Sequence, residues 1–325
     1  MTLARRRFLT VAASALALPA LTRRSRAENY PSRPIRLLVG FPPGGAADII
    51  ARLTGQMLSE RLGQPIVVEN RGSAGQQIAA EAVVNAPPDG HTLLLLANPN
   101  VINGMLNPSL NLSFTRDLAP IGGVDLNPLI LEVHPSLPVK SVPDLIAYAK
   151  THPGEINMAS GGVGSTPHLA GELFKMLTGI TMLHVPYRGD APAVTDLLAG
   201  QDQVMFDLIL LSLNHIRGGE LRGLAVTSTT RLPSLPDLPP VADFVPGYEA
   251  FAWQGLAAPK DTPGEIIVKL NTELNAALAD PKVKTRIADL GGVPMPMSPV
   301  EFGKLITSET EKWGKVIKFA GIKPN

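Results

Sequence analysis

Several residue types are absent or scarce in this chain, and each absence excludes a class of chemistry. Of the 325 residues none is cysteine, 5% are aromatic and 18% are charged. Without cysteine there is no disulfide, no thiolate metal site, no cysteine nucleophile and no lipid-modified N-terminal cysteine. The absence of cysteine does not by itself assign the protein to a compartment.

The residues that are present indicate a globular protein of about two domains. Hydrophobic residues make up 45% of the chain, which excludes an intrinsically disordered protein, and a length near 300 allows an ample apolar core. There are 31 prolines, roughly twice the usual share, so we expect many short elements with sharp ends.

The N-terminal segment is typical of an export signal. Arg5 and Arg6 precede an uncharged stretch that ends at Leu21, and Ser25 and Ala27 are small residues of the kind a signal peptidase accepts. The apolar run is too short to cross a bilayer as a helix. We therefore predict a twin-arginine-like signal over 1–27, removed near Ala27, and a periplasmic location. The general secretory route and a basic helix lying on a membrane are the alternatives.

Removal of residues 1–27 changes the charge of the chain. The signal contains six arginines and no acid, so the mature protein has 23 basic and 28 acidic residues and a net charge of −5. No basic stripe is left that could bind nucleic acid. No later run of about 18 apolar residues could span a membrane. We expect neither nucleic acid nor a membrane among the direct partners, and a monomeric mature protein.

Short aliphatic runs alternate with helical patterns along the mature chain, which predicts an α/β fold. The simplest arrangement is a two-lobed, clam-shell binding protein, with a mostly parallel sheet flanked by helices in each lobe. Residues 28–126 and 248–325 would form lobe 1 and residues 127–247 lobe 2. The chain would then cross between the lobes twice, which makes a hinge.

Two glycine-rich loops, each between a strand and a helix, are the candidate binding sites. In the first, Phe41, Gly44, Gly45 and Asp48 lead into a helix, whose exposed amides and partial positive charge suit a carboxylate. A plain tight turn, with Asp48 favourable to the helix dipole, explains the same residues.

The second loop repeats this design in the second half of the chain. It offers three glycines, two hydroxyl groups and a nearby histidine, and its candidates are Ser160, Gly164, Ser165, Thr166 and His168. Capping of the helix by Ser165 or Thr166 is expected in addition to ligand contact. Neither loop matches a nucleotide-binding pattern.

Other polar residues at predicted strand ends are weaker candidates for the pocket wall, namely Tyr187 and Asp207. The six histidines show no metal-ligand spacing, and no nucleophile elbow or zinc-protease motif occurs. We expect no metal, no cofactor and no enzymatic activity. A hydrolase or lyase that uses Ser165 and His168 is the alternative, although no third, orienting acid is evident.

The order and spacing of several motifs resemble one family, the Bug-type solute receptors of tripartite tricarboxylate transporters. The motifs are Phe41-Pro-Pro-Gly-Gly with Asp48 and Arg52, Val68 to Arg71, Asp89-Gly90, Gly161 to Thr166 with His168, and Val185 to Gly189. The resemblance continues through Leu224 to Thr227 and Trp253 to Trp313, and so covers nearly all of the mature chain.

This resemblance implies a receptor that closes over a small carboxylate or amino acid and presents it to an integral-membrane permease. It also implies that both glycine loops hold the ligand carboxylate, largely through backbone amides. The sequence departs from the family at the turn Arg71 to Gln76, where Ser73 and Gln76 could change the ligand preference. Asp48 and Asp207 would disfavour a polyanion and could receive an amino group. A receptor that signals to a membrane sensor is the remaining alternative.

Overall fold

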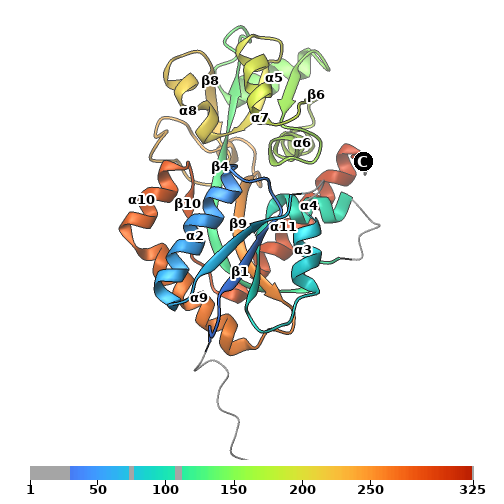
Figure 1. Cartoon of the computed structure of the whole chain (residues 1–325). Coiled ribbons are helices and arrows are strands. Elements are labelled where there is room, and N and C mark those ends of the chain that lie inside the picture. Colours follow the sequence, from blue (N-terminus) through green and yellow to red (C-terminus); the bar gives the residue numbers. More distant parts are fainter. Residues whose placement is uncertain (1–29, 73–76, 107–111, 324–325) are drawn as a thin grey trace, which may run out of the picture.

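The computed structural model describes residues 30–72, 77–106 and 112–323. The expected export signal over 1–27 and the turn residues 73–76 lie outside these ranges. The described chain forms a lower and an upper lobe (Figure 1). None of its helices is both long and apolar enough to cross a bilayer. The α/β class and the two-lobed arrangement are thus confirmed.

Lobe 1 begins with three parallel strands and their helices. The strand order β2-β1-β3 places the first strand in the centre. The elements are β1 (Ile35–Val39), α2 (Ala46–Leu62), β2 (Ile66–Asn70), α3 (Gln77–Val84), β3 (Thr92–Ala97) and α4 (Asn98–Leu106).

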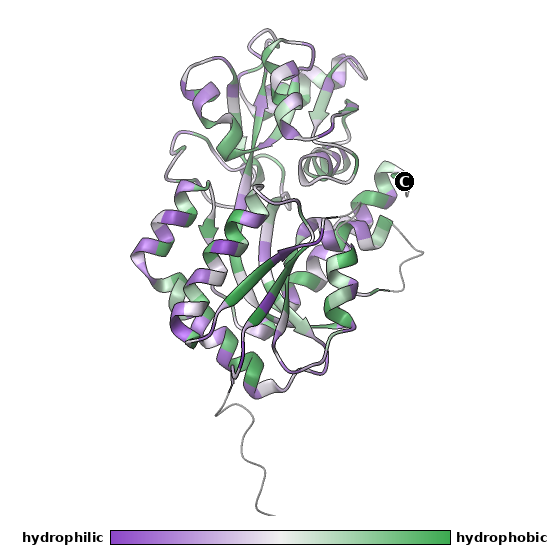
Figure 2. Ribbon diagram, viewed as in Figure 1, coloured by the Kyte–Doolittle hydropathy of each residue, from purple (hydrophilic) through white to green (hydrophobic). Residues whose placement is uncertain are grey.

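Both faces of this sheet are covered, which explains the nearly continuous apolar runs of its strands. Leu37 packs in the cluster beneath α2 and α9 (Gly264–Ala279), whereas Leu38 packs in the cluster on the opposite face. Leu93 and Leu94 divide in the same way because successive side chains of a strand point to opposite faces. In Figure 2 these strands are mostly green, and the surrounding helices alternate between green and purple.

A single long strand, β4 (Leu118–Val133), belongs to both lobes. Its first part pairs with β9 (Phe251–Pro259) up to Pro128, and from Leu129 it pairs with β7 (Val204–Leu208) and β8 (Arg222–Val226) instead. The aliphatic run at 129–133 predicts only the end of this strand, so its first eleven residues were missed. The first crossing between the lobes is therefore continuous β-strand.

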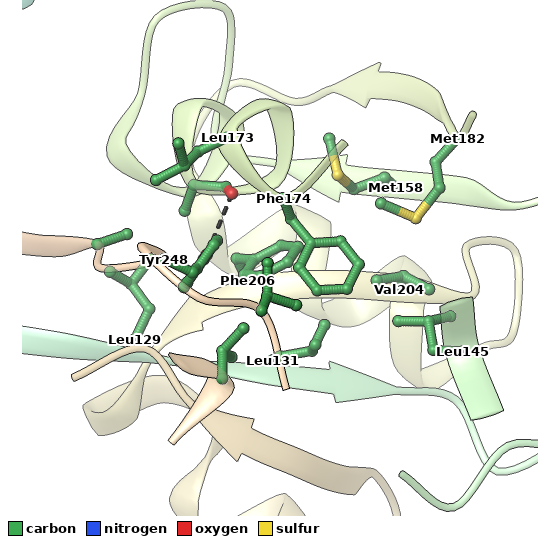
Figure 3. Packing of buried hydrophobic residues seen from close by; sticks show 14 of the residues in the cluster. Leu129, Leu131, Leu145, Met158, Leu173, Phe174, Met182, Val204, Phe206 and Tyr248 are labelled. Carbon is green, nitrogen blue, oxygen red and sulfur yellow. Dashed lines mark hydrogen bonds between the residues drawn. The ribbon is translucent and has the colours of Figure 1, made fainter. Parts of the chain in front are cut away.

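Lobe 2 repeats the alternation of strands and helices. Its sheet has the order β4-β7-β5-β6, with β8 also paired to β4. The elements are α5 (Val142–Thr151), β5 (Asn157–Ser160), α6 (Thr166–Thr178), β6 (Leu183–Pro186), α7 (Asp190–Leu198), β7 (Val204–Leu208), α8 (Ile209–Arg217) and β8 (Arg222–Val226). Phe174, Phe206 and Tyr248 pack together in its core, where the Tyr248 hydroxyl donates to the Ala170 carbonyl (Figure 3).

The second crossing returns the chain to lobe 1 beside the first. The Thr227 amide donates to the Leu129 carbonyl, and the Ala250 amide donates to the Thr227 carbonyl. The proline-rich segment before it holds a short 3-10 turn, Val241–Asp243, and buries Leu232 and Leu235. It is an ordered crossing, as its sequence indicates.

The two crossings explain why the sheets are mixed rather than mostly parallel. β4 leaves lobe 1 at the hinge and β9 enters lobe 1 at the hinge, so the two strands must run antiparallel. The same geometry makes β8 antiparallel to β4 in lobe 2. Parallel pairing is kept by β1 with its two neighbours and by β5 with its two neighbours.

The C-terminal elements cover the lobe 1 sheet and also reach lobe 2. They are α9 (Gly264–Ala279), α10 (Pro281–Asp289), β10 (Val293–Pro294) and α11 (Pro299–Ala320). Trp313 and Val316 of α11 share an apolar cluster with Ile102 and Leu106 of α4 and with the core of lobe 2. The end of α11 and α6 lie side by side in Figure 1. The lobes therefore touch through side chains as well as through the two crossings.

Candidate functional site

A cavity of about 460 Å³ lies between the lobes beside the hinge. Lobe 1 contributes the start of α2, including Gly44 and Ile49, and lobe 2 contributes the start of α7 at Asp190. The cavity lies at the carboxyl ends of β1 and β6, where open α/β sheets place their ligands. Its size is within the range of small-molecule sites.

Asp48 fixes the conformation of the loop before α2, which borders this cavity. The Asp48 carboxylate accepts hydrogen bonds from the Gly44 amide at 2.9 Å, from Arg52 Nε at 3.0 Å and from Asn70 Nδ2 at 2.9 Å. The bond from Arg52 is the largest of the effects that lower its pKa. Because both carboxylate oxygens have partners, Asp48 organises the loop and is not free to receive an amino group.

The first turn of α2 has unused amides. The first intrahelical bond runs from the Ile49 amide to the Gly45 carbonyl, so the amides of residues 46–48 have no acceptor within the helix. Gly45 is the N-cap and has no side chain that could accept from them. Gly44 lines the cavity with φ of 84°, a backbone conformation that favours glycine. Phe41 lies next to this loop, where its carbonyl accepts from Asn70.

The residues of the second glycine loop gather with one another and do not line the interlobe cavity. Ser165 caps α6 by accepting from the His168 amide, and the Gly164 amide donates to His168 Nδ1 at 3.0 Å. Thr166 is buried in the first turn. Of the two capping candidates, Ser165 and Thr166, the N-cap is Ser165.

The histidine of this loop is part of an internal stack. The His168 ring lies 3.7 Å from the His184 ring, and His184 Nε2 lies 2.6 Å from Ser160 Oγ. Burial, together with the nearby His184 and Lys175, lowers the pKa of His168 to about 3. Since Nδ1 already accepts from Gly164, His168 is neutral and cannot take a proton from Ser165. This geometry counts against a Ser-His hydrolase.

His168 faces a different cavity of about 580 Å³. That cavity is formed by α6, β6 and the end of α11, and its wall includes Glu172, Lys175, His184 and Phe319. Gly164 instead faces α4, since a Cβ at this position would lie 2.9 Å from Leu106 Cδ1. The second loop is therefore a packing contact between the lobes.

Tyr187 and Asp207 point into lobe 2. The Tyr187 hydroxyl lies 2.8 Å from Asp196 Oδ2 and 2.7 Å from Asp202 Oδ2. Asp207 is fully buried just behind the cavity wall formed by Leu208. Neither side chain lines the cavity.

Asp207 is linked to a second buried acid, Glu132, through the Ser212 hydroxyl. Ser212 Oγ lies 2.6 Å from Asp207 Oδ2 and 2.7 Å from Glu132 Oε1. A hydroxyl has one hydrogen to donate, so one of the two carboxyl groups must be protonated and donate to Ser212. Burial raises the pKa of Asp207 to about 7 and raises that of Glu132 as well.

The floor of the cavity contains polar residues that were not predicted. Asp125 and Asn127 of β4 and Gln254 of β9 line it, and Asp125 is directly opposite Gln254 in the sheet. Burial raises the pKa of Asp125 to about 7. The available signal was the pair Asp125 and Asn127 within the otherwise apolar run Gly122 to Leu131, of which only the part from Leu129 was predicted as extended.

The start of α7 is the lobe 2 counterpart of the start of α2. Its N-cap is Gly189, again without a side chain, and Asp190 occupies its first turn as Asp48 does in α2. Burial raises the pKa of Asp190, and the Gly161 amide opposes that effect. Two glycine-capped helix ends therefore meet at the cavity, one from each lobe.

A larger apolar cavity of about 720 Å³ adjoins the first one. It lies between α8, the loop 232–234 and helices α9 and α10, and shares Ile209, Leu210 and Gly291 with the first. It lacks the two glycine-capped helix ends. The described residues contain no group of three acids or histidines that could hold a metal ion.

Comparison with known proteins gives a consistent result over nearly the whole chain. Residues 50–322 match the model of the tripartite tricarboxylate transporter family receptor. The protein BugT of Bordetella pertussis is 38% identical over 300 residues, which cover 91% of this chain and 92% of BugT.

Two solved structures with ligands are also similar. The R. palustris protein Rpa4515 with adipate is 37% identical, with a TM-score of 0.76 over 91% of this chain and 100% of its own. MatC of Rhodopseudomonas palustris with bound malate is 32% identical, with a TM-score of 0.72 over 89% of this chain and 100% of its own. The matched family consists of receptors, in agreement with the expectation that the chain is not an enzyme.

Proposed function

Because the chain belongs to the family of tripartite tricarboxylate transporter receptors, we propose that it binds a small carboxylate between its lobes and delivers it to the membrane permease of such a transporter. The family membership itself establishes a solute receptor. The position of the ligand site, the delivery of the ligand to a permease and the periplasmic location of the protein are what we propose beyond that.

The observation that carries the proposal is the meeting of two glycine-capped helix ends at one cavity. The amides at the start of α2 lie before its first intrahelical bond, and the helix dipole adds partial positive charge there. A carboxylate is the natural ligand of such an end. The adipate and malate in the two solved relatives are carboxylates, which supports the same chemistry here.

We assign the ligand contacts to the loop before α2 and to the start of α7. Gly44 and Gly45 would hold the carboxylate through the backbone, with Phe41 and Asp48 shaping the loop. The second glycine loop would stabilise the packing of lobe 2 without touching the ligand, as would Tyr187 and Asp207. Its residues are Ser160, Gly164, Ser165, Thr166 and His168. Lobe 1 (28–126 plus 248–325) and lobe 2 (127–247) would close over the ligand by rotating about the two adjacent crossings, at Leu129 and Ala250.

A ligand screen tests the receptor. The mature protein is unfolded and refolded to remove bound ligand, and its melting is followed with a panel of carboxylates, each paired with its uncharged carboxamide. A ligand at 100 times its dissociation constant adds about 2.7 kcal/mol, or several degrees. We expect the carboxylates to stabilise and the carboxamides not to. A panel without any carboxylate-specific shift would contradict the proposal.

Delivery and export require tests in cells. Uptake of the identified, labelled ligand should fall when the receptor is deleted and return when it is restored. The exported protein should begin at Glu28 in N-terminal sequencing of the periplasmic fraction. Replacement of Arg5 and Arg6 by lysine should keep it in the cytoplasm if the twin-arginine route is used, and leave export unchanged on the general secretory route.

A further inference from the structure

We propose that the ligand of this cavity has a protonated amino group as well as its carboxylate, and that Asp125 and Asp190 receive the amino group. This rests on the proposed function, because the carboxylate is assumed to occupy the start of α2. The inference narrows the substrate class to amino acids, with the amine at the α position or at the far end of the chain.

The first observation is an unpaired acceptor in the cavity floor. Asp125 lines the cavity and is 1% exposed. Its Oδ2 accepts from Asn127 Nδ2 at 2.6 Å, whereas Oδ1 has no partner among the described residues. Gln254, directly opposite on β9, also has a carbonyl oxygen without a described partner. Buried acceptors nearly always find a donor, so these oxygens call for hydrogen-bond donors from a ligand or from water.

The second observation is the charge of the cavity wall. Asp125 is on the floor and Asp190 is at the start of α7, and no lysine, arginine or histidine lines the cavity in the described part of the chain. The internal segments 73–76 and 107–111 contain no such residue in their sequence either. The second carboxylate of a dicarboxylic acid would face like charge, whereas an ammonium group would face opposite charge and brings three donors.

The remaining wall is apolar. Ile49 and Ile50 of α2, Leu208 to Leu211 of lobe 2 and Leu290 contribute hydrocarbon surface between the polar ends. A molecule with a carboxylate at one end, an ammonium near the floor and a hydrocarbon body would satisfy all three parts of the wall. The expected ligand is thus an amino acid with an apolar body.

Calorimetric titration of the refolded mature protein with matched ligand pairs tests this. Leucine is compared with 4-methylpentanoate, and 6-aminohexanoate with hexanoate and adipate, so that both positions of the amine are covered. In at least one set we expect the amino acid to bind about 30-fold more tightly, the order expected for a buried, hydrogen-bonded charge pair. Asp125→Asn should remove that preference, and the exposed Asp243→Asn should leave it unchanged.

Asp190→Asn provides the same test at a half-buried position if Asp125→Asn does not fold. Carboxylates that bind as tightly as their amino counterparts would overturn the inference but leave the receptor intact. An amino preference that survives both substitutions would overturn the assignment to these acids. If no ligand bound, either in these titrations or in the melting screen of carboxylates, the receptor proposal would be overturned as well.

Discussion

The two glycine loops look alike in sequence, yet they have different structural roles. Each follows a strand, contains adjacent glycines and leads into a helix. The loop before α2 borders the interlobe cavity, whereas the loop before α6 is bonded to His168 and packs against α4. The difference lies in what happens to the amides of the first helical turn.

Counting those amides explains the contrast. In α2 the N-cap is Gly45, and three amides precede the first intrahelical bond. In α6 Ser165 accepts from the His168 amide, and Pro167 has no amide hydrogen, so only one amide is left. A helix whose first turn is already satisfied has little to offer an anion. The lobe 2 partner of α2 is therefore α7, whose N-cap Gly189 has no side-chain acceptor and whose first turn keeps two amides, since Pro192 has none.

The largest effect should come from a side chain at Gly44. Gly44→Val places a branched side chain at the cavity wall and should weaken ligand binding at least about 100-fold, an estimate based on loss of a charge-assisted site. Calorimetric titration with the ligand identified in the screen measures this loss of affinity.

Gly63→Val is the matched control for Gly44→Val. Both glycines have positive φ, 84° and 69°, and a Cβ at either would meet no atom within 4 Å. Both variants should therefore lose a similar 1–2 kcal/mol of stability from backbone strain. Equal loss of binding in the two variants would show that strain, and not the site, is responsible.

The cavity acids should make the ligand-free protein less stable as pH rises. Burial raises the pKa of Asp125 to about 7, so the folded state binds more protons than the unfolded state between the two pKa values. The free energy of unfolding should fall by about 2.5 kcal/mol from pH 5 to pH 8 through this group. Urea unfolding at both pH values measures the fall, which should be smaller by that amount in Asp125→Asn.

Binding should show the opposite trend for an amine-bearing ligand. An ammonium group favours ionised Asp125, so affinity should rise toward pH 7 and then level off. A dicarboxylate that accepted a proton from Asp125 would instead bind more weakly as pH rises. Asp48, whose pKa is lowered by Arg52 and its other donors, stays ionised throughout this range.

Capping α2 should reduce binding without harming the fold. Gly45 has φ of −82° and ψ of 172°, close to the −67° and 158° of Ser165, and a Cβ there meets only the Pro42 carbonyl at 3.8 Å. Gly45→Ser should bond a first-turn amide and compete with the ligand, which we expect to weaken binding about 10-fold. Stability should rise by a few tenths of a kcal/mol, roughly the difference between the two caps. Unchanged affinity would contradict a role for these amides.

Removal of the cap of α6 is the reciprocal change and the smallest effect. Ser165→Ala deletes the acceptor for the His168 amide and should cost about 1 kcal/mol of stability. Affinity should stay within twofold, because this loop does not line the cavity. A large loss of affinity with normal stability would restore Ser165 as a direct ligand contact.

Local signals in the sequence predicted many helix starts correctly. Ser141, three residues before Asp144, caps α5, and Ser298 with Glu301 has capping-box spacing and forms that box in α11. Thr262 with Glu265 has the same spacing and predicts a cap for α9, but the Thr262 hydroxyl donates to the Pro259 carbonyl and the helix begins at Gly264. A capping pattern predicts the cap correctly where the side chain has no competing hydrogen-bond partner nearby. Where such a partner exists, tertiary contacts decide whether the cap forms.

The sequence alone determined the α/β class, the two lobes, the family and the glycine loop at α2, since each depends on periodicity or on motifs close together in the chain. Only the tertiary structure decided which helix of lobe 2 meets α2, and that β4 continues through the hinge. It also brought Asp125 and Gln254 together, although 129 positions separate them, because β4 and β9 pair in lobe 1 next to the hinge. The cavity is made of contacts between distant segments, which no local pattern specifies.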